Sequence, residues 1–136
     1  MKNIFSLFGG ILLILISSAG YSGELKYSND PSQDPSIGYK SVDEALVALK
    51  GKEGVEVRIQ QGWIIAQDAS EGSVWSFAPE EHPAHPAAVK RTVFEEDGSV
   101  HIKTGILCQS RKAECDKLAE QFQELNDRVR QEMQGK

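Results

Sequence analysis

The chain has little positive charge, few cysteines and no motif of a known catalytic centre. Lysine and arginine total 15 against 20 acidic residues, for a formal net charge of -5. Nucleic-acid and anionic-lipid binders cluster basic residues, so neither class fits this composition. Gly-x-Ser-x-Gly, His-Glu-x-x-His and Cys-x-x-Cys are all absent from the sequence. We therefore expect a non-enzymatic protein that needs no cofactor and binds no nucleic acid.

The N-terminus has the three-part layout of a secretory signal peptide. Lys2 supplies a basic start, residues 4–16 are nearly all apolar, and small residues follow up to Ser22. The apolar stretch is too short to cross a bilayer comfortably. We expect cleavage near Ala19 or Ser22, which defines residues 1–22 as the signal peptide and leaves no stable membrane insertion. The alternative is an uncleaved anchor. A bacterial periplasm is the expected compartment, and no cysteine follows the small residues to carry a lipid.

Two cysteines in an exported chain favour a disulfide. Cys108 and Cys115 are seven residues apart. On one continuous helix that spacing corresponds to about 10 Å along the axis, beyond the reach of a disulfide. The bond therefore requires Cys108 to precede a helix and Cys115 to lie near its first turns. Ser110 is the expected N-cap between them.

The remainder divides into a flexible linker and one domain. Residues 23–40 are rich in Ser, Asn, Asp and Pro and contain little to bury. A single domain is expected over residues 41–136, with no internal repeat and a monomer as the starting assumption. It opens with Ser41 and Glu44 spaced as a capping box. Apolar residues at helical spacing and Gly51 as a stop predict a helix of about nine residues.

Alternation of apolar and polar residues predicts a meander of about five strands. The turns between them are expected at Gln61-Gly62, at residues 68–73, in a Pro-rich stretch and at residues 96–99. The strands are expected over residues 55–60, 63–66, 74–77, 89–95 and 100–106.

The C-terminal segment predicts a long amphipathic helix. Its apolar stripe consists of Cys115, Leu118, Ala119, Phe122, Leu125, Val129 and Met133. The fold class is α+β: a short N-terminal helix, an antiparallel meander and a long C-terminal helix packed on one sheet face. We expect both helices on that face. The other face would carry Glu56, Arg58, Gln60, Lys90, Thr92, His101 and Lys103.

The segment from Trp75 to Arg91 is the most distinctive part of the domain, because it combines aromatics, prolines and two histidines. One interpretation is a rigid crossover between strands, with Trp75 and Phe77 in or over the core. A second is a contact surface for an unknown envelope protein, formed by Trp75, Phe77, His82, His85 and Arg91. A third is a weak metal site at His82 and His85. Catalysis has no nucleophile or orienting group in its favour, so no catalytic residue is assigned. Contact with an envelope protein is the leading hypothesis, and low-affinity metal binding is the alternative.

These motifs resemble a family of small exported bacterial proteins without an assigned function. The resemblance rests on Trp-x-Phe-x-Pro from Trp75, His-Pro-Ala-His-Pro from His82, Val-Lys-Arg from Val89, and the two cysteines. It covers about residues 41–132. Some members carry a label linking them to J-domain co-chaperones. A J-domain needs His-Pro-Asp, whereas alanine follows both His-Pro pairs here. The resemblance therefore implies a compact family and transfers no functional residues.

Overall fold

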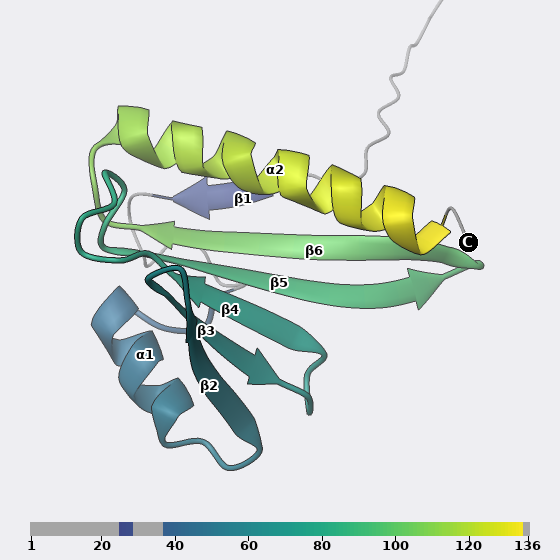
Figure 1. Ribbon diagram of the computed structural model, residues 1–136, viewed down its shortest axis with the longest axis horizontal. Helices are drawn as coiled ribbons and strands as arrows, with labels where there is room; N and C mark the ends of the chain where they lie inside the picture. The colour runs from purple at the N-terminus through teal and green to yellow at the C-terminus, as the bar shows by residue number, and fades with distance from the viewer. Residues whose placement is uncertain (1–24, 29–36, 135–136) are drawn as a thin grey trace, which may run out of the picture.

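The computed structural model describes residues 25–28 and 37–134, which form a six-stranded sheet and two helices (Figure 1). The strand order is β1-β6-β5-β4-β3-β2. Neighbouring strands from β2 to β6 are antiparallel, and β1 runs parallel to β6. The elements are β1 (Leu25–Ser28), α1 (Val42–Lys50), β2 (Val55–Gln60), β3 (Trp63–Asp68), β4 (Ser73–Phe77), β5 (Ala87–Glu96), β6 (Ser99–Cys108) and α2 (Lys112–Gln134). The predicted α+β class and five-strand meander are confirmed.

The two helices pack on opposite faces of the sheet, which corrects the expectation that they share one. Successive strand residues point to opposite faces. On β5, Ala88 belongs to the core under α1, whereas Val89 belongs to the core under α2. On β6, Leu107 and Ile106 divide in the same way. Each side of the central strands therefore carries its own hydrophobic core, and no face is left wholly to solvent.

The polar residues expected together on a solvated face divide accordingly. Register places Arg58 beside Ile65, and Ile65 beside Ser76, on the α2 side. Lys90 pairs with Trp75 on the α1 side. Polar positions therefore mark the uncovered parts of both faces.

Local signals in the sequence position α1 and the tight turns as predicted. Ser41 is the N-cap of α1, and its Oγ accepts from the Glu44 backbone N–H at 3.0 Å. Gly51 ends the helix. The β2–β3 turn consists of Gln61 and Gly62, both with positive φ, as a two-residue turn of this twist requires.

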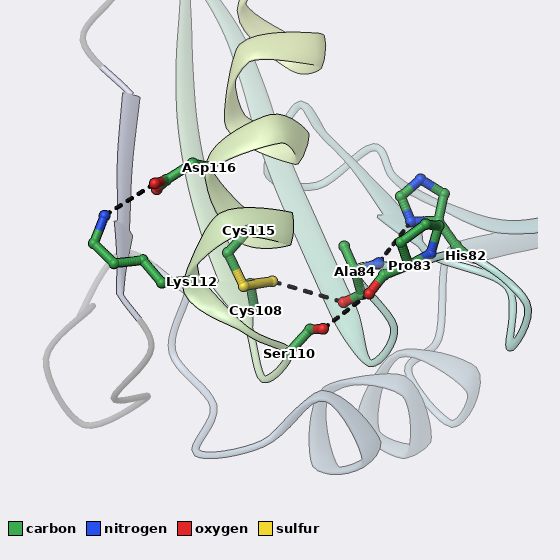
Figure 2. The surroundings of a disulfide bond; sticks show 8 residues. All are labelled: His82, Pro83, Ala84, Cys108, Ser110, Lys112, Cys115 and Asp116. Atoms are coloured by element: carbon green, nitrogen blue, oxygen red, sulfur yellow. Dashed lines mark hydrogen bonds and ion pairs between the residues drawn. A yellow bond between two sulfur atoms is a disulfide. The ribbon is translucent and has the colours of Figure 1, made fainter.

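A disulfide between Cys108 and Cys115 joins the end of β6 to the first turn of α2, as predicted (Figure 2). The Cα atoms are 5.8 Å apart. Ser110 is not the N-cap, since α2 begins at Lys112. Its hydroxyl instead donates to the Pro83 carbonyl at 2.8 Å. The predicted apolar stripe of α2 is also too long, because Met133 is exposed.

Part of the segment expected to be a linker, residues 23–40, belongs to the sheet and core. β1 lies within it and pairs with β6, and Ile37 is buried with the α1 core. A sixth strand was not predicted, because four residues give too short a pattern to recognise. The predicted signal peptide, residues 1–22, lies outside the described residues. Within the described ranges, neither helix is both long and apolar enough for a membrane crossing.

Packing of α2 predicts a large stability difference between two phenylalanine truncations. Phe122 of α2 is buried in the core between this helix and the sheet, whereas Phe94 near the end of β5 is exposed. Phe122→Ala should reduce the free energy of unfolding by about 3–5 kcal/mol, as for other buried phenylalanines. Phe94→Ala should change it far less. Urea unfolding of both variants measures this, and equal losses would place the α2 face outside the core.

Candidate functional site

The loop between β4 and β5, residues 78–86, is fastened to its surroundings and acts as a rigid crossover. Ala78 N–H donates to the Ala87 carbonyl at 3.0 Å, and Gln109 N–H donates to the Pro86 carbonyl at 2.8 Å. Figure 2 shows the loop against the disulfide, with Cys108 Sγ 3.6 Å from the Ala84 carbonyl oxygen. An oxidised sulfur has no proton, so this is a packing contact. The loop is therefore held from both ends and along its middle.

The predicted contact residues do not form one surface. Trp75 and Phe77 are each 2% exposed and lie in the core on the α1 side. Their rings stack with centroids 6.0 Å apart, and Tyr39 meets Trp75 edge-on. Arg91 lies on the opposite face, because it is two residues from Val89 of the α2 core. Trp75 and Phe77 therefore serve the interior and are not available for contact with a partner.

His82 supports a neighbouring aromatic ring and is already engaged in the loop. Its Nδ1 accepts from the Ala84 backbone N–H at 3.0 Å. In the neutral ring the proton is then on Nε2, so ligation of a metal through Nε2 would require the opposite tautomer. The ring meets Trp63 edge-on with centroids 5.2 Å apart. His85 is exposed on the loop. The described residues contain no group of three or more His, Cys, Asp or Glu placed for a metal ion.

A pocket of about 230 Å³ lies between α2 and strands β3 to β5 and brings Arg91 together with Trp63. Its apolar wall comes from Trp63, Ile65, Phe122 and Leu125. Glutamines, a serine and two arginines supply its polar groups: Gln60, Gln61, Ser76, Arg91, Gln121 and Arg128. None of the described residues that line it is acidic. We call this the Arg91 pocket.

The guanidinium of Arg91 lies partly buried in this pocket, and no described residue forms an ion pair with it. Its Nε is buried and has no hydrogen-bond acceptor among the described residues. Burial lowers the pKa of Arg91, yet an arginine stays charged at neutral pH. Its Cζ lies 5.3 Å from the centroid of the Phe122 ring, which is a cation–π distance. The pocket therefore offers donors and positive charge to an acceptor that the described chain does not itself supply.

A second unsatisfied polar group lies on the same face of the sheet. Asn126 of α2 is buried, and its Nδ2 donates to Thr104 Oγ1 at 2.8 Å. Its Oδ1 has no donor within the described part of the chain. Thr104 is the direct cross-strand partner of Arg91. Buried polar atoms without a partner are uncommon in folded proteins, so an unpaired donor and an unpaired acceptor under one helix call for an explanation.

The charged cluster on the α1 side is neutralised from within. Lys52 Nζ lies 2.6 Å from Asp68 Oδ2, and Lys90 Nζ lies 3.0 Å from Glu71 Oε1. Asp68 is almost fully buried, and its Oδ1 accepts from the Ser70 backbone and hydroxyl. Two pockets of about 210 and 250 Å³ adjoin these residues. Each of these four charged groups already has a partner of opposite charge. The cluster therefore stabilises the β3–β4 turn, and none of the four groups is left free to bind a ligand.

Comparison with known proteins gives no information about the function of this site. No protein-family model, no curated protein and no solved structure matches the chain. No residue role is therefore transferred from another protein.

Sequence reasoning identified Arg91 and missed its companions. Trp63 comes from β3, whereas Phe122 and Arg128 come from α2, and only the packing of α2 on the sheet brings them together. One signal was available. The run Trp63-Ile64-Ile65-Ala66 is apolar at consecutive positions, which is typical of a strand covered on both faces. Because Ile64 and Ala66 face α1, this pattern indicates that Trp63 and Ile65 are covered on the opposite face of the sheet.

The buried carboxylate of Asp68 predicts a specific loss of stability in acid. The hydrogen bond from Lys52, and then that from Ser70, lower the pKa of Asp68 below its ordinary value. Because the pKa of Asp68 is lower in the folded state than in the unfolded chain, its full contribution to the free energy of unfolding is present only above the unfolded-state pKa, which is near 4. This stabilising contribution of Asp68 is lost as the pH falls through the pKa of Asp68 in the folded state. Asp68→Asn should therefore be less stable than wild type at pH 7, and the difference should narrow below about pH 4.

Urea unfolding at a series of pH values measures this difference. Glu71→Gln provides a matched comparison, because Lys90 lowers the pKa of Glu71 at a more exposed position. Parallel stability curves for wild type and Asp68→Asn from pH 7 to 3 would contradict the proposed role of the ion pair.

Proposed function

We propose that the protein is a non-enzymatic accessory protein of the bacterial envelope that binds another polypeptide through the Arg91 pocket. The observation that carries this proposal is the partly buried guanidinium of Arg91 in a pocket with no acidic residue in its lining. The partner presents a carboxylate next to an apolar side chain. This retains the contact hypothesis but moves its centre from Trp75 to Arg91.

The pocket chemistry supports a carboxylate as the group recognised. A guanidinium offers several N–H donors in a planar fork that matches a carboxylate. The unpaired Nε of Arg91 and the rim position of Arg128 both favour an anion. Partial burial weakens competition from water and strengthens the pair relative to one on the open surface.

The apolar wall and the amide rim support a polypeptide as the carrier of that carboxylate. Trp63 and Phe122 meet edge-on with centroids 5.8 Å apart, and aromatic side chains are enriched among interface hot spots. Gln60 and Gln121 line the same pocket and can both donate to and accept from a peptide backbone. A pocket of about 230 Å³ suits one or two side chains of a larger partner.

The envelope location is supported by the signal-peptide layout of residues 1–22 and by the disulfide. Disulfides form and persist in oxidising compartments such as the periplasm. The rigid loop that carries His82 contributes by supporting Trp63, because the His82 ring meets the Trp63 ring edge-on. Metal binding by His82 and His85 has no specific observation in its favour among the described residues.

The proposal predicts that a free carboxylate and Arg91 are both needed for binding. N-acetyl-leucyl-phenylalanine with a free carboxylate should bind, and the same compound as its C-terminal amide should not. Arg91→Met keeps the aliphatic stem of the side chain and removes the guanidinium. It should weaken binding by about 1.5–3 kcal/mol, or roughly 10- to 150-fold in Kd. Calorimetry or peptide-detected NMR titration measures this.

Lys117→Met is the matched control, since it removes one positive charge from an exposed position of α2. Its affinity should equal that of the wild type. The melting temperature of Arg91→Met should stay near the wild-type value, because Arg91 makes no ion pair within the described chain and the variant loses only a cation–π contact with Phe122. Equal binding of acid and amide, no binding of either, or unchanged affinity of Arg91→Met would each refute the proposal.

A further inference from the structure

Strand β2 lies at an edge of the sheet, and within residues 25–28 and 37–134 no strand pairs with its outer side (Figure 1). An open edge presents unpaired N–H and C=O groups in a row. The two-residue turn at Gln61-Gly62 makes Gln60 and Trp63 a hydrogen-bonded pair. Alternation then directs the backbone groups of Gln60, Arg58 and Glu56 toward β3. Those of Val55, Val57 and Ile59 point outward.

The side chains of this edge do not protect it in the usual way. Natural edge strands are often short or carry charged side chains, a proline or a bulge. β2 is a regular six-residue strand without a proline or a bulge, and its two charged side chains, Glu56 and Arg58, are of opposite sign. Val57 is 40% exposed and Ile59 is 74% exposed, and both lie on the α1 side. Apolar side chains and free backbone groups at one edge together favour the addition of another strand.

The charges on the other side of β2 are also without partners of opposite sign. Neither Glu56 nor Arg58 forms an ion pair within the described residues. Arg58 donates instead to Gln60 Oε1 at 3.2 Å. The order of the strand is Val-Glu-Val-Arg-Ile, so that opposite charges flank Val57 symmetrically.

We propose that two copies of this chain pair through antiparallel β2 strands about a two-fold axis at Val57. In this register Val57 faces its own copy, and Val55 faces Ile59 of the other chain. Glu56 lies directly opposite Arg58 of the other chain, twice over. The outward backbone groups of Val55, Val57 and Ile59 then pair with one another. Glu56 and Arg58 occupy the pairs without backbone hydrogen bonds, where side chains are closest.

Neighbouring two-fold registers are less favourable for a definite reason. A centre at Glu56 places two glutamates opposite each other, and a centre at Arg58 does the same with two arginines. Like charges directly opposite are destabilising. A centre at Ile59 extends the pairing into the turn at Gln61. Charge and strand length thus select the register centred on Val57.

The dimer would join two six-stranded sheets into one continuous sheet. A two-fold axis perpendicular to the sheet keeps both α2 helices on the same side. Two Arg91 pockets would then open on one face and could engage a partner with two binding segments. This departs from the starting assumption of a monomer. It rests on β2 alone and does not depend on what the Arg91 pocket binds.

A charge exchange tests the proposed register directly. Arg58→Glu and Glu56→Arg each replace two opposite-charge pairs with two like-charge pairs. Each variant alone should dimerise at least about tenfold more weakly than wild type. Mixing the two variants restores opposite charges at both pairs, so a heterodimer should form. The doubly exchanged chain Glu56→Arg/Arg58→Glu should again form a homodimer.

Sedimentation velocity over a concentration series measures these states on protein recovered after expression of the full chain. Glu120→Arg is the control, because it changes an exposed charge on α2 by the same amount and should leave dimerisation unchanged. Circular dichroism verifies that every variant is folded. A wild-type protein that stays monomeric at high concentration would overturn the proposal. Dimers unaffected by either single variant, or no heterodimer on mixing, would do the same.

Discussion

Burial of the central strands on both faces is the constraint on which the rest of this structure depends. β5 and β6 each contain consecutive apolar residues, so neither face of the sheet centre can remain in water. α1 covers one face and α2 the other. The disulfide fixes where α2 starts, and α2 then runs lengthwise along β6 (Figure 1). The Arg91 pocket lies under this helix, where strands β3 to β5 continue beyond the apolar core.

Features coded by neighbouring residues were predictable from the sequence. Ser41 and Glu44 mark the start of α1, Gln61-Gly62 marks a two-residue turn, and spacing alone placed Cys108 before α2. The side of the sheet that each helix covers depends on contacts between distant segments. The alternation of Val55, Val57 and Ile59 suggested that one whole face of the sheet is exposed to solvent. That inference was wrong because β2 is an edge strand and does not represent the central strands. The doubly apolar runs in β3, β5 and β6 were the better guide.

The candidate site divides in the same way. Arg91 was selected from sequence because it follows a distinctive loop, but its assumed companion Trp75 lies in the opposite core. The register of β4 and β5 determines this, since Trp75 pairs with Lys90 and Arg91 pairs with Val74. Phe122 and Arg128 reach the pocket from α2, more than 30 residues away in sequence. The functional proposal therefore rests on an unpaired guanidinium that no local motif could reveal.

The Arg91 guanidinium is proposed to bind a carboxylate of a partner. The NMR signal of the Arg91 Nε–H reports directly on whether such a hydrogen bond forms. The signal is assigned by its absence from Arg91→Met. On addition of N-acetyl-leucyl-phenylalanine with a free carboxylate, it should shift to higher frequency and exchange more slowly with water, as expected for a new charge-assisted hydrogen bond. The amide analogue should leave it unchanged. An Arg91 Nε–H signal that responds to neither compound, or equally to both, would contradict the account.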